Sequence, residues 1–204
     1  MLIGPMAVGK SAIGQQLAQH LGARFVDTDA EVVAQHGTIA EIFAGRGECA
    51  FRELEARAVA HAIEEAAGTN AAGTNAAGSN AAGSNAAGTN TVISLGGGAV
   101  LDSGTQQLLA GCTVVYLECD ADTVSERIAR NSGRPLLAGD AMERWRALFA
   151  TRQPIYERLA DLVLDVRSGS VADLAHRLED ALEQLAAAHA APAPAPAATK
   201  EVEK

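Results

Sequence analysis

The residues from Gly4 to Ser11 follow the pattern G-x-x-x-x-G-K-S near the start of the sequence. Such glycines let backbone N–H groups turn toward a chain of phosphates, while the Lys10 ammonium reaches the β- and γ-phosphate oxygens and the Ser11 hydroxyl ligates magnesium. Apolar residues then recur at helical spacing up to Leu21, so the positive end of a helix faces the same phosphates. A glycine-rich turn that matches by chance is the alternative. The pattern predicts a nucleotide-binding loop made of Gly4, Pro5, Met6, Ala7, Val8, Gly9, Lys10, Ser11 and Ala12.

The charge balance excludes several classes of partner. The chain has 204 residues and a net charge of −9, from 25 acidic and 16 basic side chains. This is unlike the basic surface of a protein that binds nucleic acid or an anionic membrane. No apolar run has the length of a membrane span, and no signal-peptide pattern precedes the loop. We expect a cytoplasmic monomer with no nucleic-acid or membrane partner.

The elements that must position the loop alternate between short apolar runs and helical stretches. Such alternation is typical of an α/β domain whose parallel sheet is covered by helices on both faces. We expect one domain over residues 1–188. Strands are expected at the start of the chain and near 23–29, 91–95, 113–117 and 162–166. Helices are expected over 11–21, 30–36, 38–43, 47–66, 103–109, 121–130, 141–159 and 171–188.

Two segments have a composition that does not favour a packed core. Residues 66–90 are five consecutive pentads of the form AAGTN or AAGSN, without a large apolar or charged side chain. Too little surface can be buried to offset the entropy of ordering them, so we expect a flexible insertion. A small solenoid built from repeats is the alternative, but its pentads would need large apolar residues to stack. The alanine- and proline-rich residues 189–204 are expected to be a disordered tail.

Five further groups of residues follow the loop in order. Asp27-Thr28-Asp29 ends an apolar run, where ligands bind in open α/β sheets. Arg52 stands on a predicted helix with Glu48 and Glu55 at positions i−4 and i+3, on the same face. A triple glycine, 96–98, ends the next strand, and Arg134-Pro135 and Arg152-Gln153-Pro154 come later in the chain.

Taken together, these groups resemble the shikimate kinase family over about residues 1–180. The resemblance implies a three-layer P-loop kinase fold with a five-stranded parallel sheet and a mobile lid near 131–139. It also implies transfer of the ATP γ-phosphoryl group to the 3-hydroxyl of shikimate, with Mg²⁺, in aromatic amino acid biosynthesis. Kinases of another small hydroxy acid such as gluconate, and a regulatory module that binds nucleotide or shikimate without turnover, are the alternatives. Ala7 departs from the family, because a glycine is usual at that position.

The resemblance also assigns roles to residues on the acceptor side. Asp29 would orient a ring hydroxyl of shikimate and accept its proton, and Gly96, Gly97 and Gly98 would let the backbone approach the substrate. Arg52 and Arg152 would grip the shikimate carboxylate, since an arginine fork matches a planar carboxylate. For Arg52 the alternative is an ion-pair array on the helix surface.

The remaining roles concern the nucleotide and the metal. Asp27 would join Ser11 around magnesium; a turn or helix N-cap is the alternative for the acidic pair. Lys10 and Arg134 would stabilise charge on the transferred phosphoryl group. Arg127 would stack on adenine, with an exposed helix arginine as the alternative. The five histidines share no motif, and we expect surface or capping positions for them.

Overall fold

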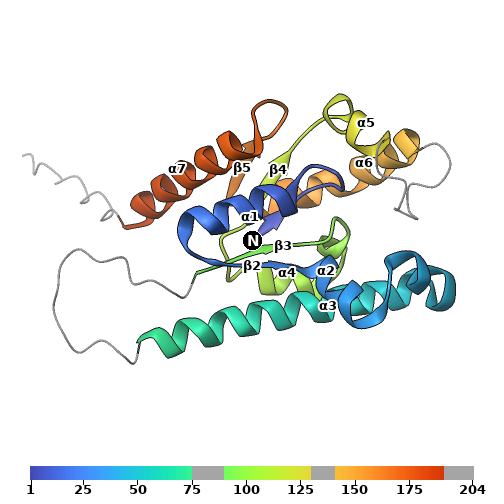
Figure 1. Ribbon diagram of the computed structural model, residues 1–204, viewed down its shortest axis with the longest axis horizontal. Helices are drawn as coiled ribbons and strands as arrows, with labels where there is room; N and C mark the ends of the chain where they lie inside the picture. The colour runs from blue at the N-terminus through green and yellow to red at the C-terminus, as the bar shows by residue number, and fades with distance from the viewer. Residues whose placement is uncertain (75–89, 130–140, 191–204) are drawn as a thin grey trace, which may run out of the picture.

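The computed structural model describes residues 1–74, 90–129 and 141–190, and Figure 1 shows a central sheet with helices on both of its faces. Five strands are hydrogen-bonded in the order β2-β3-β1-β4-β5, and every neighbouring pair is parallel. The predicted five-stranded parallel sheet is therefore confirmed, with β1 at its centre. The strands are β1 (Leu2–Ile3), β2 (Arg24–Asp27), β3 (Thr91–Ser94), β4 (Val115–Glu118) and β5 (Leu162–Asp165).

Most helices lie within one or two residues of the ranges that the apolar periodicity predicts. The helices are α1 (Lys10–Leu21), α2 (Thr28–His36), α3 (Ile39–Thr74), α4 (Ser103–Leu109), α5 (Ala121–Ala129), α6 (Ala141–Leu159) and α7 (Val171–Ala190). A short 3-10 turn, η1 (Ala99–Leu101), follows the triple glycine and was not predicted. Among the described residues, no helix has the length and apolar character needed to cross a lipid bilayer.

Helix α3 differs from its prediction in two ways. The two helices expected over 38–43 and 47–66 form one element, which is kinked at Gly47, where φ is 80° and ψ is 171°. The helix then continues to Thr74, so residues 66–74 are helical and do not belong to a structureless insertion. Alanine has the highest helix propensity, and extending a formed helix requires no new nucleus, so these pentads can prolong a helix that they would not start. The other pentads, over 75–89, lie outside the described residues.

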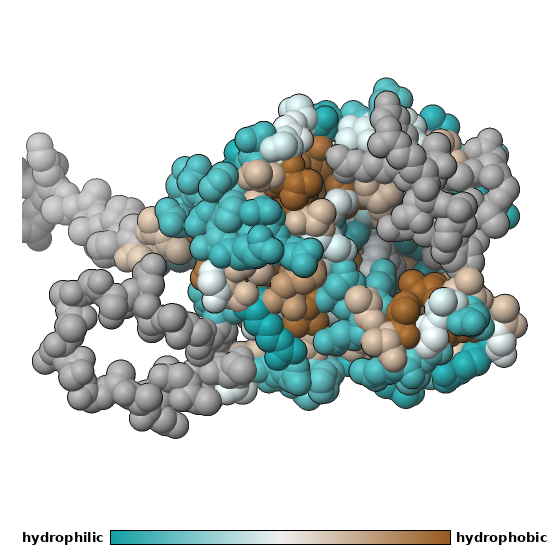
Figure 2. Space-filling view, viewed as in Figure 1, coloured by the Kyte–Doolittle hydropathy of each residue, from teal (hydrophilic) through white to brown (hydrophobic). Residues whose placement is uncertain are grey.

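The core has two layers because the strand residues alternate between the two faces of the sheet. Leu2 packs with apolar residues of α1 and α7, whereas the next residue, Ile3, packs with apolar residues of α3 and α4. Both side chains are 1% exposed. On the face seen in Figure 2, hydrophilic side chains cover much of α3, and apolar side chains gather only in small separate patches.

Candidate active site

The predicted phosphate-binding loop connects the central strand β1 to helix α1. Two of its glycines have positive φ, 140° at Gly4 and 104° at Gly9. A Cβ on Gly4 would also lie 2.8 Å from the Leu117 carbonyl oxygen of the neighbouring strand β4. Ala7 has φ 66° and is the one non-glycine residue of the described chain with positive φ. The alanine thus adopts the left-handed conformation that a glycine would adopt freely, at a cost of about 1–2 kcal/mol.

The Lys10 side chain closes the loop from inside. Its Nζ donates hydrogen bonds to the carbonyl oxygens of Gly4, at 2.9 Å, and Pro5, at 2.8 Å. Lys10 is only 8% exposed, so its charge is held in the concave part of the loop. A cavity of about 300 Å³ opens there and is lined by Met6, Ala7, Gly9, Lys10, Ser11, Ala12, Asp27, Asp29, Ser94, Leu95 and Gly97. The cavity joins the loop to the acidic pair and to the triple glycine.

The acidic pair lies where strand β2 passes into helix α2. Asp27 caps this helix, because its Oδ1 accepts a hydrogen bond from the Ala30 N–H at 3.2 Å. The capping alternative is therefore confirmed for Asp27. Its Oδ2 accepts a hydrogen bond from the Ser11 hydroxyl, so a carboxylate and a hydroxyl oxygen meet at the loop. Oxygen donors of this kind are those that Mg²⁺ prefers.

Thr28, between the two aspartates, has a role that the sequence analysis did not identify. Its side chain is fully buried, and its Oγ1 donates to the Ser94 carbonyl at 3.3 Å and accepts from the Gly96 N–H at 3.2 Å. The hydroxyl thereby connects the end of β2 to the triple glycine. A polar residue between two acids at a strand end was the only signal for it in the sequence.

The triple glycine leaves room for charged groups on two neighbouring helices. A Cβ on Gly96 would overlap the carboxylates of Asp29 and Glu55, and a Cβ on Gly98 would overlap the guanidinium of Arg52. Gly97 approaches the phosphate-binding loop, since a Cβ there would lie 3.2 Å from the Met6 nitrogen. Side chains at these positions would force the charged groups away from the backbone.

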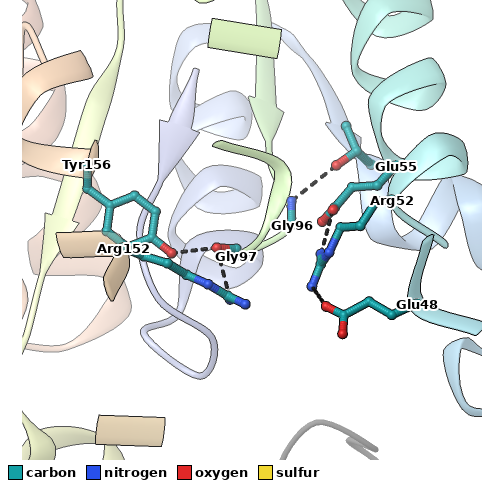
Figure 3. Close-up of polar contacts among 8 residues, drawn as sticks. Glu48, Arg52, Glu55, Gly96, Gly97, Arg152 and Tyr156 are labelled. Atoms are coloured by element: carbon teal, nitrogen blue, oxygen red, sulfur yellow. Dashed lines mark hydrogen bonds and ion pairs between the residues drawn. The ribbon is translucent and has the colours of Figure 1, made fainter. Parts of the chain in front are cut away.

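Arg52 is held by both of the glutamates that helical spacing predicts. Its Nη1 donates to Glu55 Oε2 at 2.6 Å and its Nη2 donates to Glu48 Oε1 at 2.9 Å. Glu55 is 2% exposed, and burial raises the pKa of its carboxyl group, while the charge of Arg52 opposes that shift. The two glutamates therefore fix the direction of the guanidinium (Figure 3). It lies beside Gly98.

Arg152 approaches the triple glycine from the opposite side, as Figure 3 shows. Its Nη1 donates to the Gly97 carbonyl oxygen at 3.3 Å, and Tyr156 Oη donates to the same oxygen at 2.5 Å. Burial raises the pKa of Tyr156, so the phenol stays a neutral donor. Arg152 is 4% exposed, yet no carboxylate of residues 1–74, 90–129 or 141–190 forms an ion pair with it. A buried cation without such a partner is costly unless an anion binds beside it.

Trp145 also belongs to the site, although the sequence analysis did not single it out. The indole is buried, stacks on Phe149 with ring centroids 4.8 Å apart, and donates from Nε1 to the Met6 carbonyl oxygen at 3.0 Å. Helix α6 therefore donates to the phosphate-binding loop through Trp145 and to Gly97 through Arg152 and Tyr156. The spacing of these residues along one helical face was the available signal.

The described structure does not include the side chains of two predicted site residues. Arg127 belongs to helix α5. Arg134 and the expected lid near 131–139 lie outside the described residues. Their roles stay predictions.

The fold and the site together define a P-loop kinase that acts on a small molecule. A phosphate-binding loop follows the central strand of a parallel sheet, and its cavity extends to Asp29 and Gly97. Arg152 donates to the carbonyl oxygen of that same Gly97. The phosphate-binding loop suits a nucleotide, and the arginines beside the triple glycine suit a small anionic acceptor.

Comparison with known proteins identifies the family. The sequence model described as "Shikimate kinase" matches residues 6–82 and 79–183, so the match divides within the pentads. Shikimate kinase of Streptomyces coelicolor is 39% identical over 184 residues, which cover 90% of this chain and 94% of that protein. Shikimate kinase of Mycobacterium avium is 43% identical over 167 residues, which cover 81% of this chain and 82% of that protein. The chain belongs to the shikimate kinase family.

Solved structures agree with this assignment. A shikimate kinase from Acinetobacter baumannii, described as a complex with shikimate, superimposes with a TM-score of 0.75 at 27% identity and covers 90% of this chain and 91% of its own. A shikimate kinase from Aquifex aeolicus gives a TM-score of 0.69 at 28% identity, and the match covers 91% of this chain and 96% of that chain. The α/β fold predicted from the sequence is confirmed by both.

Proposed function

We propose that this chain transfers the γ-phosphoryl group of ATP to the 3-hydroxyl of shikimate, forming shikimate 3-phosphate. Family membership makes it an ATP-dependent phosphotransferase with an alcohol group as acceptor. The relatives named shikimate kinase, and the similar structure described with shikimate, support the choice of acceptor.

The observation that carries the proposal is the buried, charged guanidinium of Arg152 beside Gly97. Glu55 acts on this charge only over a longer distance. A carboxylate bound beside Arg152 would supply the direct ion pair that the described residues do not form, through two parallel N–H···O bonds. Arg52 faces the same glycine segment from the other side, with Glu48 and Glu55 fixing its direction. We infer that the two arginines and Gly96–Gly98 bind the carboxylate side of shikimate.

Asp29 would bind the hydroxyl side of the acceptor. It lies in the first turn of α2 and lines the same cavity as Lys10 and Gly97. A carboxylate in this position orients the acceptor hydroxyl toward the nucleotide and accepts its proton as the phosphoryl group moves. Positioning and charge stabilisation would supply most of the rate enhancement.

The nucleotide would lie on the loop from Gly4 to Ala12. Backbone N–H groups and the Lys10 ammonium would bind the β- and γ-phosphates. Ser11 and Asp27 would hold Mg²⁺, consistent with the two oxygen atoms that meet there. Bound Mg²⁺ neutralises charge on the phosphates during transfer. The proposal also places Arg134 over the transferred group and Arg127 on the adenine. It further includes a monomeric state and a cytoplasmic location.

An acceptor panel tests the proposal. ADP release is measured with saturating Mg·ATP and with shikimate, gluconate or another hydroxy acid as acceptor. We expect the highest kcat/KM with shikimate and a product phosphorylated at the 3-hydroxyl. Preference for gluconate would identify a different kinase. Binding of ATP and shikimate without phosphate transfer would identify a regulatory module.

A further inference from the structure

Three polar side chains meet on the side of the molecule away from the phosphate-binding loop, where α7 lies against α1 (Figure 1). His20 is in the last turn of α1, and His176 and Glu179 lie one turn apart on α7. Glu179 Oε2 is 3.4 Å from His20 Nδ1 and 3.8 Å from His176 Nδ1. All three possible ligand atoms lie within 4.8 Å of one another. The histidines share no sequence motif, so only the packing of the two helices brings them together.

His20 Nδ1 has the properties of a metal ligand. The atom is buried and has no hydrogen-bond partner within the described structure, and the side chain is 18% exposed. The other ring nitrogen, Nε2, lies 2.9 Å from the Gln16 side-chain amide. The atom of Gln16 at this distance is the amide nitrogen, which donates to Nε2. A half-turn of the amide brings its oxygen to Nε2–H instead, and the lone pair of Nδ1 then points toward Glu179. Metal-ligating histidines are usually held in this way through their second nitrogen.

The distances suit a borderline transition-metal ion. Bonds of 2.0–2.1 Å in a tetrahedron place neighbouring ligand atoms about 3.4 Å apart. The His20–Glu179 separation equals this value, and the His176–Glu179 separation is slightly longer. The His20 and His176 rings now stack, with centroids 4.3 Å apart and planes 24° apart, so one ring must turn for both nitrogens to face one ion. His176 is 66% exposed and has the space to turn.

We propose that His20, His176 and Glu179 bind one Zn²⁺ ion, with water as the fourth ligand, and that the ion clamps the end of α1 to α7. Two imidazoles and one carboxylate are a donor set that suits Zn²⁺, whereas Mg²⁺ prefers oxygen ligands and octahedral geometry. His20 is nine residues along α1 from Ser11, about 13 Å at 1.5 Å per residue. The site is therefore separate from the proposed magnesium site and stabilises the fold without taking part in phosphoryl transfer.

Zinc titration of the full chain tests this site. Protein freed of metal with a chelator is titrated with ZnCl₂ in excess Mg²⁺ by calorimetry, and its Tm is measured with and without Zn²⁺. We expect one ion per chain and a higher Tm with Zn²⁺. His20→Gln, His176→Gln and Glu179→Gln should each weaken binding at least tenfold and abolish the rise in Tm. Circular dichroism of the metal-free variants verifies that they are folded.

Two matched controls separate this site from other zinc ligands on the surface. His61 and Glu65 form an exposed pair on α3 at 3.8 Å, and Cys49 is an exposed thiol. His61→Gln and Cys49→Ser should bind Zn²⁺ like the parent protein. The inference is wrong if Zn²⁺ binding follows His61 or Cys49, or if the His20 and Glu179 variants retain the parent affinity. Shikimate phosphorylation with Mg²⁺ is expected to be unchanged in all these variants, so this test is independent of the proposed function.

Discussion

Arg152→Ala removes a guanidinium that is 4% exposed and not ion-paired with any described carboxylate. In the proposed complex this charge faces the carboxylate of shikimate, and truncating one member of a buried charge pair costs about 2–5 kcal/mol. Arg52 cannot take over the hydrogen bonds of Arg152, because Glu55 and Glu48 fix the direction of its guanidinium on the other side of the glycine segment. We expect kcat/KM for shikimate to fall about hundredfold, which corresponds to about 3 kcal/mol. Most of this loss should be a higher KM for shikimate.

A coupled ADP-release assay measures the effect, with shikimate varied at saturating ATP and then ATP varied at saturating shikimate. The KM for ATP should stay unchanged. Shikimate carboxamide, which lacks the negative charge, provides a second test. For the parent enzyme, kcat/KM should be about hundredfold lower with the amide than with shikimate. For the Arg152→Ala variant, kcat/KM should be nearly the same with the two acceptors. Thermal stability should change little, because Tyr156 still donates to the Gly97 carbonyl oxygen.

Arg158→Ala is the matched control for this prediction. Arg158 lies on the same helix, is exposed, and donates to Gln106 Oε1 at 2.9 Å. Its replacement should change kcat/KM for shikimate less than twofold. The carboxylate assignment would be refuted if kcat/KM of Arg152→Ala for shikimate stayed within threefold of the parent value. It would also be refuted if the substitution lowered kcat/KM for shikimate and for its amide by the same factor.

Three other substitutions test the geometry of the site. Gly98→Ala places a Cβ on the Arg52 guanidinium, so kcat/KM for shikimate should fall at least tenfold while nucleotide affinity, measured by fluorescence titration, stays the same. Trp145→Phe leaves the Met6 carbonyl oxygen without its indole donor, which should cost about 1–3 kcal/mol in urea unfolding and raise the KM for ATP. Burial raises the pKa of Glu55, so on acidification it takes a proton before exposed carboxyls do and Arg52 loses an ionic partner. The acid-side decline of kcat/KM for shikimate should therefore move to lower pH in Glu55→Gln.

The same raised pKa has the opposite effect on stability. The native state binds the Glu55 proton more tightly than the unfolded state, so the contribution of this group to stability is present at low pH and is lost as pH rises through the native pKa. Acidification should thus weaken activity through Glu55 while this group's contribution to stability increases. Unfolding measured across the pH range, with Glu55→Gln as the reference, separates the two effects.

Each of these substitutions has an outcome that would contradict its prediction. Glu48→Gln changes the exposed partner of Arg52 and should leave the acid-side decline in place; a shift equal to that of Glu55→Gln would exclude the buried carboxyl as its origin. Gly45→Ala adds a Cβ with no atom within 4 Å and should keep full activity. If it lowered kcat/KM for shikimate as much as Gly98→Ala, the Gly98 effect would not depend on contact with Arg52. An unchanged KM for ATP in Trp145→Phe would show that the indole does not position the loop.

The features that the sequence determined by itself are local. The spacing from Gly4 to Ser11 specifies a phosphate-binding loop, because its glycines, lysine and serine act within one turn of chain. The positions of Glu48 and Glu55 relative to Arg52 predicted both of its ion pairs, because residues three and four apart share a helical face. Apolar periodicity located the helices and strands for the same reason, although it placed the end of α3 too early.

Other features were decided by the tertiary structure, because they join residues far apart in the sequence. The strand order β2-β3-β1-β4-β5 places the loop after β1 next to the loop after β3, and helix α6 then reaches Met6 and Gly97 at once. The packing of α7 on α1 brings His20 and His176 together. No local spacing encodes these contacts. They depend on which strands become neighbours, and burial of the two apolar faces of the whole sheet selects that arrangement.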